Sequence, residues 1–229
     1  MTDSTTPRRS FLARVATSAA VVGAAPALAA IGCAPTSASS STPTTPPTGD
    51  ELDTWFASMK APYKVLYDCV QASGGPDGII FARNFMKFSG DKLGTKDADM
   101  NVVVSFRHFA TPYGYTDAMW AKYPQFAELL KVQDPTTKKP AARNIPLHDD
   151  VEGEAGANLP ALAARGVHFT VCGAATEFIA KILAGKTGDP KAIETELAAN
   201  LIPNARMVPA GVVGVQRAQK AGFAYTFAG

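Results

Sequence analysis

The chain has 229 residues, of which 46% are hydrophobic, and 22 basic residues against 20 acidic ones give a formal net charge of +2. Without the N-terminal signal described next, the formal charge is close to zero and no basic stripe remains, which argues against nucleic acid as a partner. From residue 50 onward the chain has the length of one domain with a single well-covered core.

Residues 1–33 have the features of an export signal. The run PRRSFL at 7–12 precedes an apolar, Ala-rich stretch at 15–31 that lacks acidic residues and is too short for a membrane span. This pattern resembles twin-arginine signals, although Pro7 stands where Ser or Thr is usual and Ala13 where Lys is common. Because cargo of that pathway crosses the membrane folded, the resemblance implies a domain that works outside the cytosol.

The sequence leaves two cleavage sites open. Ala27-Leu28-Ala29 fits an ordinary small-x-small site, which would release a periplasmic protein. Gly32 and Cys33 fit a lipoprotein box, in which a diacylated Cys33 would hold the protein at the cell envelope. Residues 34–49 are rich in Ser, Thr and Pro and are expected to form a flexible linker.

Over residues 50–229, short β-branched runs alternate with helical patterns. This alternation predicts an α/β domain, doubly wound, with three layers around a five-stranded, mainly parallel sheet. The predicted strands are Tyr63–Cys69, Asn101–Arg107, Val167–Cys172, Ala205–Val208 and Phe223–Phe227. Helices are predicted over 51–60, from 74, from 116 with a break at Pro124, before 166, over 173–185, from 190 and over 209–222.

Residues 133–157 interrupt this alternation with prolines, glycines, acidic residues and little to bury. A loop of this length inside a compact domain is either functional or mobile. It is either a disordered insert on the surface or a lid or subunit-contacting arm that carries Arg143, Asn144 and His148 over the sheet edge.

Several motifs in the last third of the chain follow one another in a recognisable order. They are LxxLxxRGV at 159–167, VCG at 171–173, VPAGV at 208–212, Gln216 through Gly222, and FAY at 223–225. In order and spacing they resemble the DsrE/DsrF-like family of sulfur-relay proteins, whereas the upstream part matches weakly in residues. The resemblance implies a five-stranded α/β fold and assembly into trimers or hexamers. It also implies a persulfide-carrying cysteine, which maps onto Cys172.

Cys172 is a candidate site without the resemblance. It ends a central strand, where doubly wound sheets place their sites. A helix that begins at Gly173 would direct backbone N–H groups and its positive dipole end at a thiolate. The small residues at 173–175 leave the sulfur unshielded. Alternatively, Cys172 is a small buried hydrophobe, which is common for free cysteines.

Two more strands end at the same rim as Cys172. The first closes with Asp68-Cys69 and the second with Arg107-His108, so these side chains could converge on Cys172, and Asp117 is a further candidate. Arg107 and His108 would suit an anionic substrate or a thiolate; alternatively, Arg107 caps strand carbonyls. Of the other histidines, His168 is expected in the core and His148 in solvent.

Three functions are compatible with this rim, and the sequence does not decide whether the protein is an enzyme. In the first, Cys172 carries sulfane sulfur or acts as a redox thiol that Cys69 resolves, although thiol pairs outside the inner membrane tend to oxidise. The second is a non-catalytic oligomeric module that binds a small anion or a partner. The third is a metal site of Cys69, His108 and Cys172, although no pair has the spacing of a metal motif. No cofactor is expected.

Two predictions concern pairing. Adjacent strands lie about 4.8 Å apart, which permits a disulfide between Cys69 and Cys172, whereas an intervening strand forbids it. Because the resemblance supplies no second family cysteine, we predict that the two are not bridged. A homo-oligomer is also predicted, because the aromatic segment at 113–123 exceeds what one helix needs to cover a sheet and part of it should form an interface.

Overall fold

The structure is a computed structural model that describes residues 47–229. The expected signal and most of the expected linker, including Cys33, lie outside the described residues. Within residues 47–229, none of the helices combines the length and the apolar character needed to cross a membrane.

Five strands form one parallel sheet in the order β4-β3-β2-β1-β5. The strands are β1 (Tyr63–Cys69), β2 (Met100–Phe106), β3 (His168–Cys172), β4 (Ala205–Val208) and β5 (Ala224–Phe227). The predicted three-layer α/β class is confirmed, and every pairing in the sheet is parallel.

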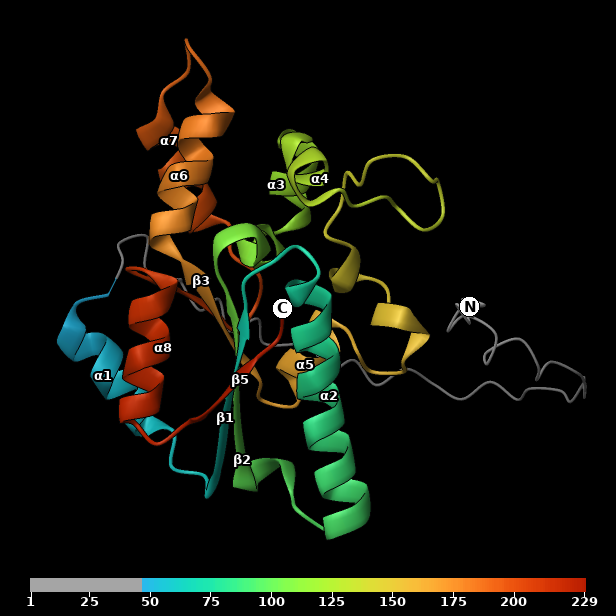
Figure 1. Ribbon diagram of the computed structural model, residues 1–229, viewed down its shortest axis with the longest axis vertical. Coiled ribbons are helices and arrows are strands. Elements are labelled where there is room, and N and C mark those ends of the chain that lie inside the picture. The colour runs from blue at the N-terminus through green and yellow to red at the C-terminus, as the bar shows by residue number, and fades with distance from the viewer. Residues whose placement is uncertain (1–46) are drawn as a thin grey trace, which may run out of the picture. The chain divides into compact units, whose positions relative to one another are not determined.

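Helices cover both faces of the sheet: α1 and α8 pack on one side, and α2 and α5 on the other (Figure 1). The helices are α1 (Gly49–Ser58), α2 (Gly74–Leu93), α3 (Asp117–Lys122), α4 (Gln125–Leu130), α5 (Leu159–Ala164), α6 (Gly173–Ala184), α7 (Pro190–Ala199) and α8 (Gly211–Lys220). Short 3-10 turns join them: η1 (Asp97–Asp99), η2 (His108–Gly114), η3 (Ile145–Leu147) and η4 (Val151–Gly153). The predicted break at Pro124 separates α3 from α4.

The strand order explains where the connecting helices lie. The chain proceeds from β1 through β4 in one direction and then returns across the sheet to β5. Right-handed crossovers place helices of the outward path on one face and α8, on the return path, on the other. Connections from the neighbouring strands β3 and β4 therefore diverge to opposite faces. Doubly wound sheets bind their ligands at such a point, beyond the carboxyl ends of the strands.

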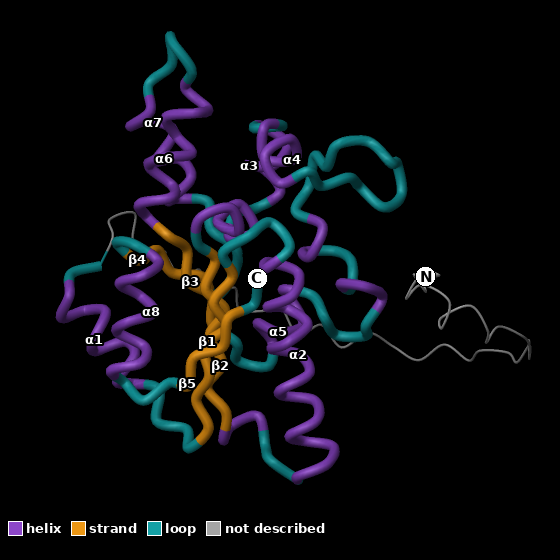
Figure 2. Tube along the Cα trace, viewed as in Figure 1, coloured by secondary structure: helices purple, strands orange, loops and turns teal. Residues whose placement is uncertain are grey.

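Both faces of the sheet are buried, so the core has one cluster of apolar side chains on each face. Along β1, Val65, Tyr67 and Cys69 belong to the core cluster on the α2 side, whereas Leu66 belongs to the cluster under α1 and α8. Strands covered on both faces are nearly continuous apolar runs, as the sequence of β2 illustrates. The tube in Figure 2 shows how the five strands stack between the two helical layers.

The aromatic segment at 113–123 does not form the exposed surface that we predicted. Tyr115 and Trp120 are fully buried in the domain's own core, and Tyr113, Met119 and Tyr123 are buried beside them. The indole Nε1 of Trp120 also donates to the carbonyl of Pro112 at 2.9 Å. These side chains pack inside the domain, where the ring of Tyr113 lies against Phe106 of β2, so they give no support to an oligomer.

Hydrogen bonds and ion pairs hold residues 133–157 against the rest of the domain. Asn144 is fully buried and its side-chain amide donates to the carbonyls of Tyr113 and Tyr115, at 2.8 Å each. Arg143 pairs with Asp134 at 2.7 Å and with Asp149 at 2.6 Å. These contacts explain why a polar, proline-rich segment adopts a defined path over the aromatic cluster.

Candidate functional site

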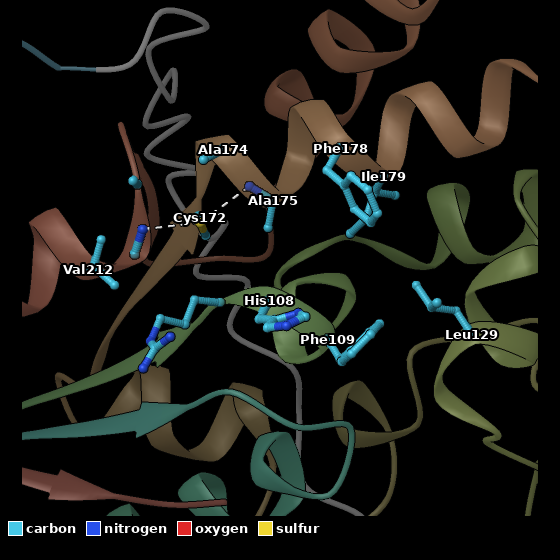
Figure 3. Close-up of a pocket in the computed structure, with 12 residues that line it drawn as sticks. His108, Phe109, Leu129, Cys172, Ala174, Ala175, Phe178, Ile179 and Val212 are labelled. Atoms are coloured by element: carbon cyan, nitrogen blue, oxygen red, sulfur yellow. Dashed lines mark hydrogen bonds between the residues drawn. The ribbon is translucent and has the colours of Figure 1, made fainter.

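Cys172 ends β3 and is also the N-cap of α6. Its Sγ atom accepts a hydrogen bond from the backbone N–H of Ala175 at 3.3 Å and another from the N–H of Gly211 at 3.0 Å (Figure 3). The sulfur thus receives hydrogen bonds from the first turns of two helices, α6 and α8. These helices follow β3 and β4, whose connections diverge to opposite faces of the sheet. Both helix dipoles present their positive ends here, an arrangement that stabilises negative charge on sulfur.

Two glycines make this close approach possible. A Cβ atom on Gly211 would lie 2.4 Å from the Cβ of Arg107, and one on Gly173 would lie 2.9 Å from the carbonyl oxygens of Val208 and Pro209. Such separations are shorter than any non-bonded contact allows. Glycine at both positions therefore lets α6 and α8 begin against the ends of β2 and β4.

A cavity of about 380 Å³, called the thiol cavity below, opens beside the sulfur. Its walls are mainly apolar and come from η2, α4, α6 and α8; the largest of these side chains are Phe109, Leu129, Phe178, Ile179 and Val212. Figure 3 shows Phe178 and Ile179 on the α6 side and His108 with Phe109 on the opposite side. Among the described residues, no carboxylate lines it. Cys172 is only 7% exposed, so the cavity is its route to solvent.

Arg107 lines the thiol cavity but is already paired. Its Nε and Nη2 atoms donate to the two carboxylate oxygens of Asp68 at 2.7 and 2.8 Å, and the hydroxyl of Tyr225 donates to the same carboxylate at 2.9 Å. Asp68 is 1% exposed. The bidentate hydrogen bond to Asp68 raises the pKa of Arg107. Most of the guanidinium charge is thus neutralised by a buried partner, which weakens the predicted role of Arg107 in holding an anion.

His108 also lines the thiol cavity and is exposed to solvent. Its backbone is in the left-handed region with φ of 52°, and its ring stacks on Phe109 with the centroids 4.2 Å apart. A non-glycine residue in this conformation is uncommon and concentrates at functional sites. The structure therefore brings His108, Arg107 and Cys172 to one cavity, as the strand ends predicted.

Cys69 does not join them. Phe106 is the register partner of both Cys69 and Val171, so these three side chains share the α2 face, and Cys172 projects from the opposite face. Cys69 is fully buried, and a Cβ atom on Gly78 would lie 2.2 Å from its sulfur. Burial raises the pKa of the Cys69 thiol well above its usual range. Both cysteines are free, which confirms the prediction that they are not bridged.

Asp117 binds residues of the segment 133–157 and does not line the thiol cavity. Its carboxylate accepts from the backbone N–H of Asn144 at 2.9 Å and contacts Nε2 of His148 at 2.5 Å. His148 is exposed, as expected. His168 is half-buried and its ring meets Trp55 edge-on, with the centroids 5.6 Å apart; burial lowers its pKa.

Metal ligands do not gather in the described part of the chain, where no group of three His, Cys, Asp or Glu side chains could hold an ion. Sequence reasoning missed two parts of the site. One is Gly211, whose signal was the short strand-Pro-x-Gly start of α8. The other is the apolar wall of the thiol cavity, in which Phe178 of α6 is 57% exposed.

Comparison of this chain with family models, with curated proteins and with solved structures found no match. The resemblance to the DsrE/DsrF-like family therefore rests on the residues quoted above and remains a prediction.

Proposed function

We propose that this protein is an exported, single-thiol sulfur carrier in which Cys172 accepts a sulfane sulfur atom and holds it as a persulfide. The observation that carries the proposal is the pair of N–H groups, from Ala175 and Gly211, directed at Sγ. A nucleophilic thiolate and a bound persulfide are both anions, and donors at this position stabilise either one.

The reaction needs only one cysteine. The Cys172 thiolate attacks a sulfane sulfur of a polysulfide, a new S–S bond forms, and the polysulfide leaves one sulfur shorter with the electron pair of the broken bond. His108 lines the same cavity and is the group suited to accept the thiol proton beforehand. Transfer onward is the same exchange in reverse, with an acceptor thiolate attacking the outer sulfur.

A dithiol redox cycle with Cys69 has less support. Cys69 faces the other side of the sheet, is fully buried, and lies beyond β2 from Cys172. A disulfide would require neighbouring Cβ atoms about 3.5–4.5 Å apart. Sulfur transfer through one thiol avoids this requirement.

The proposal is tested by incubating the full chain with inorganic polysulfide and mapping its peptides by mass spectrometry. We expect one added sulfur atom on the Cys172 peptide, removed by a thiol reductant and absent from C172S. The variant C69A should behave like the wild type. A Cys172 that stays unmodified in the folded protein but reacts after unfolding would refute the proposal.

A second candidate is a non-catalytic module that uses the cavity for a partner or small ligand. It is favoured by the low exposure of Cys172 and by the neutralised charge of Arg107. In that case C172A would retain ligand or partner binding, whereas a sulfur carrier would lose its function completely.

Export and assembly complete the proposal. The twin-arginine pattern supports transport of the folded domain, followed by release into the periplasm or by lipid attachment at Cys33. Incorporation of labelled palmitate into the wild type but not into C33S would establish the anchor. The family resemblance supports a trimer or hexamer, and a monomer by light scattering at micromolar concentration would contradict it.

A further inference from the structure

We infer that the molecule with which Cys172 reacts is an apolar organic disulfide or polysulfide, whose hydrocarbon group occupies the thiol cavity. The inference rests on the proposed thiol function and goes beyond it by assigning the substrate class. Three observations lead to it: the apolar walls, the pairing of the Arg107 guanidinium with Asp68, and the position of the sulfur.

The walls suit a hydrocarbon group. Phe109 and Phe178, on opposite sides of the thiol cavity, are 37% and 57% exposed, and Val212, which also lines it, is 62% exposed. Leaving such side chains in water costs free energy that a hydrocarbon ligand would recover. The volume of about 380 Å³ is within the range of small-molecule pockets.

The charges argue against a small inorganic anion as the fitted ligand. Arg107 is the only Lys or Arg among the described lining residues, and its guanidinium donates two hydrogen bonds to Asp68. The two helix N-termini direct their N–H groups at the sulfur of Cys172 itself. A neutral ligand that leaves these donors on the sulfur is therefore the better fit.

The position of the sulfur defines the chemistry. The thiolate of Cys172 attacks one sulfur of R–S–S–R, the S–S bond breaks, and a mixed disulfide Cys172–S–S–R forms. The second R–S group leaves as a thiolate and takes a proton from water. With a trisulfide R–S–S–S–R, attack at an alkyl-bearing sulfur gives Cys172–S–S–R and releases R–S–S⁻. The backbone N–H groups of Ala175 and Gly211 then stabilise Cys172 whenever it returns as the leaving thiolate.

The test uses ethyl, butyl and hexyl 2-pyridyl disulfides with the full chain carrying C33S. Attack on the alkyl-bearing sulfur releases pyridine-2-thione, whose absorbance gives the rate. Each rate is divided by that of glutathione with the same reagent, which removes intrinsic reactivity. We expect the ratio to rise with chain length, approaching roughly fourfold for each methylene that becomes buried. A carboxyethyl reagent should react more slowly than the butyl reagent of similar length.

Two phenylalanines provide a matched pair of variants. F178S removes an exposed wall of the thiol cavity and should flatten the dependence on chain length. F88S removes a phenylalanine that is 48% exposed on α2, outside the cavity, and should leave the dependence unchanged. Because both side chains are substantially exposed, neither change is expected to unfold the domain. Peptide mapping verifies that the modified residue is Cys172.

Each outcome has a defined meaning. Ratios independent of chain length overturn the inference, while persulfide formation at Cys172 can still uphold sulfur transfer. A chain-length dependence without persulfide formation upholds the inference and refutes sulfane-sulfur carriage. If Cys172 reacts neither with the disulfide reagents nor with polysulfide, both the inference and sulfane-sulfur carriage are refuted. If the ratios are flat and F178S converts an oligomer into a monomer, the apolar wall is a subunit interface and the inference is wrong.

Discussion

Cys69 and Cys172 end the first and third strands of one parallel sheet, yet their side chains project from opposite faces with β2 between them. Cys172 lies at a cavity that opens to solvent, whereas Cys69 is packed against α2. The strand order that places two helix N-termini beside Cys172 thus leaves Cys69 on the other face of the sheet, outside the site.

This difference predicts selective alkylation. Iodoacetamide should modify Cys172 in the folded protein and leave Cys69 unmodified, because Cys69 is fully buried and burial raises its pKa. Peptide mass spectrometry after timed quenching measures both sites. Guanidinium should make the two cysteines equally reactive. Faster labelling of Cys69 than of Cys172 in the folded protein would contradict the site.

A second prediction concerns Gly211. In G211A the new methyl group would lie 2.4 Å from the Cβ of Arg107, so the start of α8 must shift away from the sulfur. We expect a loss of about 1–3 kcal/mol in stability from the overpacking and slower alkylation of Cys172. The control is G90A in α2, where the nearest atom to a new Cβ is 3.6 Å away. Denaturant unfolding and alkylation rates are the measurements, and normal alkylation in G211A would show that the Gly211 donor is unimportant.

The strands and most helix ends could be predicted because their signals are local. Pro190 follows its N-cap Asp189, whose carboxylate accepts from the N–H of Lys191 at 2.9 Å, and Gly185 is the C-cap of α6. Turn-forming residues of this kind also lie beside the five strands. Sequence periodicity was therefore sufficient for the α/β class and for placing Cys172 at a strand end.

The arrangement of the site was not predictable because it depends on strand order. Only once β1 and β2 are neighbours does Arg107 reach Asp68, and only once β3 and β4 are neighbours does Gly211 reach Cys172. The exposure of the apolar stripe of α6 was not predictable for a similar reason. That helix extends beyond the carboxyl edge of the sheet, so Phe178 and Ile182 face the surface (Figure 1).

The segment 133–157 should show a pH signature centred on Asp134. Backbone N–H groups of Thr137 and Thr136 and the guanidinium of Arg143 lower the pKa of Asp134 to about 2. Since the unfolded carboxyl titrates near 3.8, its stabilising effect is complete above about pH 4 and disappears as the pH falls to about 2. D134N should thus be less stable than the wild type at pH 7, with the gap closing at acidic pH. A gap in unfolding free energy that is constant down to pH 2 would contradict this assignment.

The last prediction tests the neutralisation of Arg107. D68N removes the buried partner of a guanidinium whose side chain is 23% exposed. Breaking a buried pair costs about 3–5 kcal/mol, and partial exposure of Arg107 should reduce this to about 2–3 kcal/mol. D97N removes the partner of Arg165 in a pair of the same bidentate geometry whose side chains are 33% and 43% exposed. It should cost less than about 1 kcal/mol.

D68N should also change the selectivity of Cys172. With its charge no longer neutralised, Arg107 would attract anions to the thiol cavity, so the rate with the carboxyethyl 2-pyridyl disulfide should rise relative to the butyl reagent. D97N should leave this ratio unchanged, because the Asp97–Arg165 pair does not line the cavity. The ratio is measured in low and in high salt, since screening should reduce the gain. An unchanged ratio in a folded D68N protein would show that the charge of Arg107 does not reach the cavity, and would remove the electrostatic argument for a preference for neutral substrates.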